Sequence, residues 1–303
     1  MKNKLTVKGY AAIIVSAILF GCMPLISKHI YADGVNSMTL VLLRSALSLP
    51  FLAALAFFKR MPFIRPARDI LPVMAVGIVG CAITPLLLLS SYNYINGGTA
   101  TVLHFVYPAA VLVIELVFLR VKARAGSIIG ILLCIVGIAL FYDPTAGINL
   151  TGSILALVSG ISNALYIVLL GRLVTRGMGE YTFAFYATLG SMLSLLTVCL
   201  AGGYLALPRT IGGWLLCVLF AVMINVGAVV LFQVGTFIIG GQKASILSTF
   251  EPITSLVVGY FAFGEGIGLL SVLGSLLVIA ASVLIAVLDG KEAGKTSAAE
   301  VNE

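Results

Sequence analysis

An ionisable carboxyl group lies in the middle of a long apolar stretch of the chain. Glu251 is followed directly by Pro252, and the surrounding residues 241–265 are mostly small, hydroxyl-bearing or apolar. A carboxylate at the centre of a bilayer costs about 2.5–3.5 kcal/mol, so it normally faces protein or water. There it either binds an amine or a cation, or carries a proton. The alternative is a structural carboxyl group that hydrogen-bonds the backbone near the proline or pairs with Arg44.

This stretch predicts a bent helix that lines a cavity. Pro252 has no N–H and its ring crowds the preceding turn, so the helix should bend near Leu247–Ser248. On a helical projection Ser248, Glu251 and Ser255 share one face, which is therefore polar within an apolar span.

An earlier stretch, 144 residues closer to the N-terminus, matches this one. Nearly constant spacing also relates the helix that follows each stretch, and an offset of 143 relates residues near the two starts. Such spacing indicates a duplicated half. Matching positions are Pro108 and Pro252, His104 and Ser248, Tyr107 and Glu251, Gly130 and Gly274, and Ser16 and Ser159.

Other polar side chains also lie within apolar spans. His104 lies one turn before Pro108 and titrates near physiological pH, so it either relays protons or is a hydrogen-bonded packing residue. The uncharged polar residues either join helices or line a cavity. The candidates for substrate binding or coupling are Glu251, His104, Tyr107, Ser248, Asn163, Tyr166, Asn225 and Ser16.

Four residues are candidates for structural or gating roles: Pro108, Pro252, Pro24 and Arg44. The planar guanidinium of Arg44 suits a carboxylate ligand, but we expect a structural ion pair at this position. Pro24 either forms the hinge of an external gate or only kinks its helix.

The composition excludes an ordinary soluble domain. Hydrophobic residues make up 61% of the 303 residues and charged residues 10%, whereas about a quarter of a soluble domain is charged. At about 20 residues per crossing, the sequence predicts an all-α polytopic membrane protein with ten transmembrane helices. The predicted spans are 9–31, 36–58, 69–91, 97–119, 125–142, 151–172, 180–201, 212–235, 241–262 and 267–288.

The basic residues concentrate in alternate loops, which places both termini in the cytoplasm. The net charge of +7 is therefore a topology signal and not a nucleic-acid surface. We expect a cytoplasmic N-terminus (1–8), two five-helix repeats (9–142 and 151–288) and a disordered cytoplasmic tail (289–303). Because five is odd, the second repeat is inverted relative to the first.

No catalytic or cofactor motif stands out. There is no phosphate-binding Gly-x-x-x-x-Gly-Lys motif and no metal-binding His-Glu-x-x-His or Cys-x-x-Cys motif. The five cysteines lie in apolar runs and suit packing. We therefore expect neither a cofactor nor a bound metal.

The chain resembles the ten-helix EamA-type transporters of the drug/metabolite transporter superfamily. The likeness rests on Pro108 and Pro252, each preceded by small and hydroxyl residues, on Gly264-Glu265, and on Arg44. It covers essentially residues 9–288. The resemblance implies a five-plus-five inverted repeat around a central cavity, and export of small metabolites such as amino acids, or of drugs. The first half has Arg120-Val121 where the second has Gly264-Glu265, so no symmetric acidic pair is expected.

The leading hypothesis is a non-enzymatic secondary transporter of the bacterial inner membrane. It would export amino acids, related amphipathic compounds or drugs by alternating access, as a monomer or a homodimer. Its partners would be a small-molecule substrate and the lipid bilayer, with no nucleic acid, and proton coupling is left open. The alternatives are a translocator of lipids or lipid-linked intermediates and, more remotely, an intramembrane enzyme that uses a serine with His104 as its base.

Overall fold

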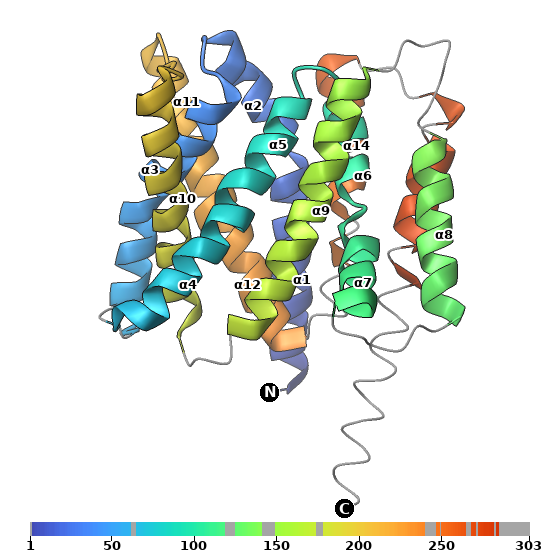
Figure 1. Cartoon of the computed structure of the whole chain (residues 1–303), viewed down its shortest axis with the longest axis horizontal. Helices are drawn as coiled ribbons and strands as arrows, with labels where there is room; N and C mark the ends of the chain where they lie inside the picture. The colour runs from blue at the N-terminus through green and yellow to red at the C-terminus, as the bar shows by residue number, and fades with distance from the viewer. Residues whose placement is uncertain are drawn as a thin grey trace, which may run out of the picture.

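The computed structural model describes residues 2–61, 65–118, 125–140, 149–173, 178–239, 247–248, 250–264, 268–270, 272–281 and 283–284. Every regular element in these ranges is a helix, and the helices run up and down as one bundle (Figure 1). The first half contains α1 (Lys2–Gly21), α2 (Met23–Ala32), α3 (Ser37–Phe58), α4 (Ala67–Gly77), the π-helical segment η1 (Ile78–Ile83), α5 (Thr84–Ser91), α6 (Gly97–His104), α7 (Tyr107–Phe118) and α8 (Ala125–Ala139). The second half contains α9 (Leu150–Leu173), α10 (Glu180–Gly202), α11 (Ile211–Ala221), the π-helical segment η3 (Val222–Ala228), α12 (Val229–Ile239) and α14 (Phe250–Phe263), followed by a short apolar helix, Val272–Ala281.

The described helices confirm an all-α polytopic membrane protein. Seven helical stretches are long and apolar enough to cross a bilayer. Three shorter apolar helices (Ile128–Ala139, Phe250–Phe263 and Val272–Ala281) coincide with the fifth, ninth and tenth predicted crossings. Parts of the ninth and tenth crossings, and the predicted tail 289–303, lie outside the described residues.

The bundle buries hydroxyl side chains within a largely apolar interior and exposes large apolar side chains on its outside. Ser45, Ser159 and Ser191 have no exposed surface, while Phe261 is 80% and Ile211 81% exposed. A water-soluble protein would bury such large apolar side chains. Lipid tails accept them, and interior hydroxyl groups then join helices by hydrogen bonds. One such bond joins Ser45 Oγ to Ser191 Oγ at 3.0 Å.

Helix contacts repeat in the two halves. α3 packs against its counterpart α10, and α6 of the fourth crossing packs against α14 of the ninth, so counterpart crossings of the two halves meet. In the same way α1 packs against η3 and α12, while α9 packs against η1 and α5. Figure 1 shows α1 and α9 running in opposite directions. The second half is therefore an inverted copy of the first.

The third crossing of each half carries a π-helical segment at the same place in the repeat. η1 and η3 begin at residues 78 and 222, which is again an offset of 144 residues. A π-helical segment widens one turn of a helix and often marks a functional site. Nothing in the apolar sequences of these two segments predicted it.

Three crossings are interrupted near prolines. α1 ends at Gly21, and α2 begins at Met23 with Pro24 in its first turn. α6 ends at His104, and α7 begins at Tyr107, directly before Pro108. The ninth crossing makes a turn at Ser248, and α14 begins at Phe250, shortly before Pro252. The predicted bend near Leu247–Ser248 is thus confirmed.

Two loops at one end of the bundle are joined by hydrogen bonds. We call the contact between these loops the link contact (residues 33–39 with 204–210). The Asp33 carboxylate accepts from the backbone N–H of Arg209 at 2.9 Å and of Thr210 at 3.2 Å. The Thr210 hydroxyl donates to the same carboxylate at 2.8 Å. Asn36 and Thr39 add further bonds to Tyr204 and Ala206. The links after the first and seventh crossings therefore lie on the same face, as an inverted repeat requires.

The first prediction concerns close packing of α4 against α10. A Cβ at Gly77 would overlap the backbone of Ala187, which has no flexible side-chain end to give way. Gly77→Val should therefore lower the free energy of unfolding by about 1–3 kcal/mol, the usual cost of overpacking. Equilibrium unfolding in detergent measures this. Gly212→Val is the matched control, because the nearest atom to a Cβ there is 3.6 Å away; equal losses in both variants would contradict the packing argument.

The second prediction concerns pH and the link contact. The hydroxyl of Thr210, with the backbone N–H groups of Thr210 and Arg209, lowers the pKa of Asp33. A lowered folded-state pKa stabilises the protein above the unfolded-state pKa of about 3.9, and that stabilisation is lost as the pH falls through the folded-state value. The difference in unfolding free energy between the native protein and Asp33→Asn should be constant above about pH 4 and shrink below it. A difference that grows on acidification would contradict this.

Candidate functional site

The Glu251 carboxyl group lies where the two halves meet. Its backbone N–H donates to the Ser248 carbonyl at 3.0 Å, across the turn that precedes α14. The carboxyl group interacts electrostatically with the phenol groups of Tyr92 and Tyr107. The side chain of Tyr107 also hydrogen-bonds that of Ser248. A helix break in the second half is thereby joined to a helix break in the first.

A second set of hydroxyl groups joins the same helices. Thr101 Oγ1 lies 3.1 Å from Ser255 Oγ and 3.5 Å from the Tyr92 hydroxyl. Because Thr101 donates its single proton to the Gly97 carbonyl at 2.9 Å, the other two hydroxyl groups must donate to it. Ser255 is on the polar face that was predicted for the ninth crossing.

Glycine residues, which have no side chain, allow these helices to approach closely. A Cβ at Gly21 would lie 2.7 Å from the Glu251 carbonyl oxygen, and one at Gly98 would lie 2.7 Å from Leu256. At Gly97 the Cβ position is taken by Pro24. The break between α1 and α2, the start of α6 and the start of α14 therefore converge beside Glu251.

His104 is hydrogen-bonded to α9 and not to Glu251. Its Nδ1 lies 2.7 Å from Ser159 Oγ, and that hydroxyl also lies 2.7 Å from the Ala156 carbonyl. A serine that donates to the carbonyl must accept from the histidine, so Nδ1 carries the proton. Ser159 has no exposed surface. The arrangement fits a hydrogen-bonded packing histidine better than the serine–base pair of an enzyme.

Among the described residues Arg44 has no partner for the ion pair that we expected. Within the described part of the chain no carboxylate lies within 4.0 Å of it, and its Nη2 donates instead to the Cys81 carbonyl at 3.0 Å. Its Nε is buried and has no hydrogen-bond partner. The Asn225 amide donates to the Arg44 carbonyl at 3.3 Å and to Ser48 Oγ at 3.0 Å. The Cys81 carbonyl belongs to η1, and Pro85, four residues later, has no N–H to donate to it.

Two of the remaining candidates, Ser16 and Tyr166, pack against the π-helical segments. Ser16 Oγ donates to the Ala228 carbonyl at the end of η3, at 2.7 Å. The Tyr166 ring occupies the space that a side chain at Gly80 of η1 would need. Asn163 is half-buried on α9. Ser16 and Tyr166 are therefore apart from the contacts around Glu251, and the predicted binding roles of all three residues stay predictions.

Tyr92, Thr84 and Ser162 also make these contacts but were not among the predicted site residues. Thr84 Oγ1 lies 2.8 Å from Ser162 Oγ and 2.9 Å from the Val79 carbonyl. Its hydroxyl group therefore bonds to η1, as the hydroxyl group of Ser16 bonds to η3. The polar run Ser90–Tyr94 at the end of the third crossing was the available signal for Tyr92.

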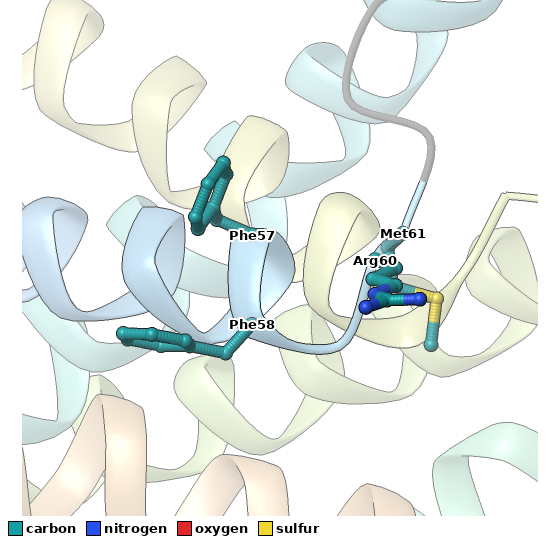
Figure 2. Close-up of a pocket in the computed structure, with 4 residues that line it drawn as sticks. All are labelled: Phe57, Phe58, Arg60 and Met61. Carbon is teal, nitrogen blue, oxygen red and sulfur yellow. The ribbon is translucent and has the colours of Figure 1, made fainter.

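A pocket of about 550 Å³ lies elsewhere, at the end of α3. Phe57, Phe58, Arg60 and Met61 line it; Figure 2 shows the two rings leaving α3 in different directions. In the described ranges no three His, Cys, Asp or Glu residues come close enough to hold a metal ion.

Comparisons with known proteins identify the family. The sequence model of the EamA-like transporter family matches residues 7–142 and again 150–287. An uncharacterized transporter of Archaeoglobus fulgidus is 30% identical over 92% of this chain and 96% of its own length. The uncharacterized inner membrane transporter YicL of Salmonella typhimurium is 25% identical over 96% of this chain and 99% of its own.

A solved crystal structure shares the fold. It has a TM-score of 0.64 at 16% identity and covers 94% of this chain and 98% of its own. With the family matched in both halves and a relative aligned along nearly the whole length, the chain belongs to the EamA-like transporter family.

Proposed function

We propose that this membrane transporter is a secondary transporter that exports small amphipathic metabolites, amino acids or related compounds among them, across the inner membrane by alternating access. The observation that carries the proposal is the position of Glu251. An ionisable side chain lies at a helix break in one half and interacts with Tyr92 and Tyr107 of the other half. Transporters built from inverted repeats bind their substrates at such breaks, near the midplane of the bilayer.

Glu251 is the binding or coupling residue in this proposal. Its carboxylate has no basic partner within 4.0 Å among the described residues, so a cationic group of the substrate or a proton supplies the missing charge. Tyr107 and Ser248 position the carboxylate by joining α7 to the turn before α14.

The link contact is the outer gate in this proposal. The loops at the other end of the bundle have an excess of lysine and arginine. This excess favours a cytoplasmic position for those loops and an outer position for the link contact. Export then requires the bonds of Asp33 to Thr210 and Arg209 to break in each cycle. Cytoplasmic termini and the repeat boundaries 9–142 and 151–288 belong to the same proposal.

The third prediction tests the role of Glu251. In proteoliposomes, Glu251→Gln should abolish the response of transport to an imposed proton gradient. It should also weaken apparent affinity for amine-bearing substrates by roughly 10- to 100-fold, because a hydrogen bond to a charged group contributes about 1.5–3 kcal/mol. A counterflow screen over amino acids, amines and quaternary cations identifies the substrates for this measurement.

Asp69→Asn is the matched control, since Asp69 lies in the first turn of α4, 3.9 Å from Arg68 at the surface, and its variant should transport normally. A Glu251→Gln variant that keeps the native rate and the native pH dependence would remove Glu251 from the mechanism. A hit list confined to lipids would favour the lipid translocator instead.

A further inference from the structure

We propose that Arg44 is an anion-binding residue of the transport pathway and that the transported molecule carries a carboxylate, which Arg44 binds. The inference rests on the proposed transport function and adds a substrate class to it. Arg44, on α3, would bind the anionic group of the substrate, which the Glu251 carboxylate cannot bind.

The first observation is an unsatisfied buried cation. Arg44 is only 6% exposed, and its Nε has no hydrogen-bond partner. Of its guanidinium nitrogens, Nη2 is the one that donates to an atom in the described part of the chain, the Cys81 carbonyl. One edge of the planar group thus keeps a free donor. A carboxylate fits such an edge because its two oxygens match the spacing of adjacent guanidinium N–H groups.

The second observation is the surrounding chemistry. Arg44 lies between the two π-helical segments: its side chain bonds to η1 through Cys81, and its backbone accepts from Asn225 of η3. Cys81 and Asn225 are separated by the repeat offset of 144 residues. Tyr166 of α9 packs against Gly80, directly before Cys81. Arg44 is thus held between η1 and η3 by neutral groups alone, and no acidic side chain pairs with it among the described residues.

A purely structural role does not account for the charge. A neutral side chain would satisfy the Cys81 carbonyl equally well, and it would avoid placing an unpaired cation inside a membrane-spanning bundle. An anion that enters when the bundle opens supplies the missing partner. Ser159, Ser162 and Tyr166 lie at a spacing of three and four residues on one face of α9. They contact His104, Thr84 and Gly80 in turn, so hydroxyl groups run along α9 beside η1, the segment whose Cys81 carbonyl accepts from Arg44.

The test that needs no transport is a binding measurement on the purified full-length protein in detergent. The probe is 3-methylbutanoate, with 3-methylbutylamine as the ligand of the same shape that lacks a carboxylate. The acid should raise the thermal unfolding temperature of the native protein and of the charge-conserving Arg44→Lys variant, the latter more weakly. In Arg44→Gln its apparent affinity should fall by about tenfold or more, as expected for the loss of a charge-assisted hydrogen bond. Arg68→Gln, the same substitution at a side chain that is 86% exposed, should bind like the native protein.

Failure of binding and failure of transport are distinguishable. In proteoliposomes, Arg44→Gln should selectively lose transport of leucine and lysine while keeping transport of 3-methylbutylamine and 1,5-diaminopentane. Equal losses for the acids and the amines would assign Arg44 a structural role and overturn the inference. A native protein that binds 3-methylbutanoate through Arg44 but transports no member of either pair would contradict the proposed function and leave the anion site standing.

Two outcomes remove the anion site itself. The first is a thermal shift by 3-methylbutanoate that is the same in the native protein and in Arg44→Gln. The second is a shift that chloride reproduces at equal concentration, which would make the residue a site for inorganic anions. If Arg44→Gln does not fold, the Arg44→Lys variant carries the test. A compact ammonium lacks the bidentate geometry, so acid affinity unchanged in Arg44→Lys would also contradict the inference.

Discussion

Backbone carbonyl groups that a helix cannot satisfy must find donors inside the protein, because lipid tails offer none. Much of the polar interior of this bundle follows from that constraint. Ser16 donates to the end of η3, and Arg44 donates to η1. Each irregular segment is thus paired with a polar side chain from a neighbouring crossing. These pairs fix which helices lie side by side, and so they also fix where the breaks around Glu251 meet.

The duplication determines how the helices pack, and the differences between the two halves determine which polar side chains lie where they meet. Helix pairing and the π-helical segments obey the repeat, but the side chains at equivalent places differ: Tyr107 stands where the second half has Glu251, and Cys81 where it has Asn225. A perfectly symmetric pair of acids at a helix break would place like charges in one low-dielectric site, where they repel. One carboxyl group beside a phenol avoids that cost. The asymmetry leaves a single ionisable acid among the described residues at the breaks, which is what a binding or coupling site needs.

The fold was predictable because it depends on composition and spacing. Apolar runs of about 20 residues define the crossings, a constant offset reveals the duplication, and Pro252 locates the bend at Ser248. The shared face of Ser248, Glu251 and Ser255 was equally readable, since helical periodicity alone decides it. The π-helical segments were not predictable, because they reflect how neighbouring crossings pack rather than any local propensity. Arg44 shows the same limit: the residue type suggested an ion pair, but its partner is a carbonyl that only η1 presents.

The central claim is that Glu251 lies between the two halves, where alternating access exposes it to water, and does not face lipid. Cysteine accessibility tests it most directly, in a variant whose five native cysteines have been replaced. A cysteine at position 248 shares the face of Glu251 and is buried, whereas one at position 257 replaces a valine that is 49% exposed on the outer side of α14. We predict that a charged, membrane-impermeant thiol reagent labels position 248 and not position 257. Labelling of position 257 with position 248 inert would contradict the account.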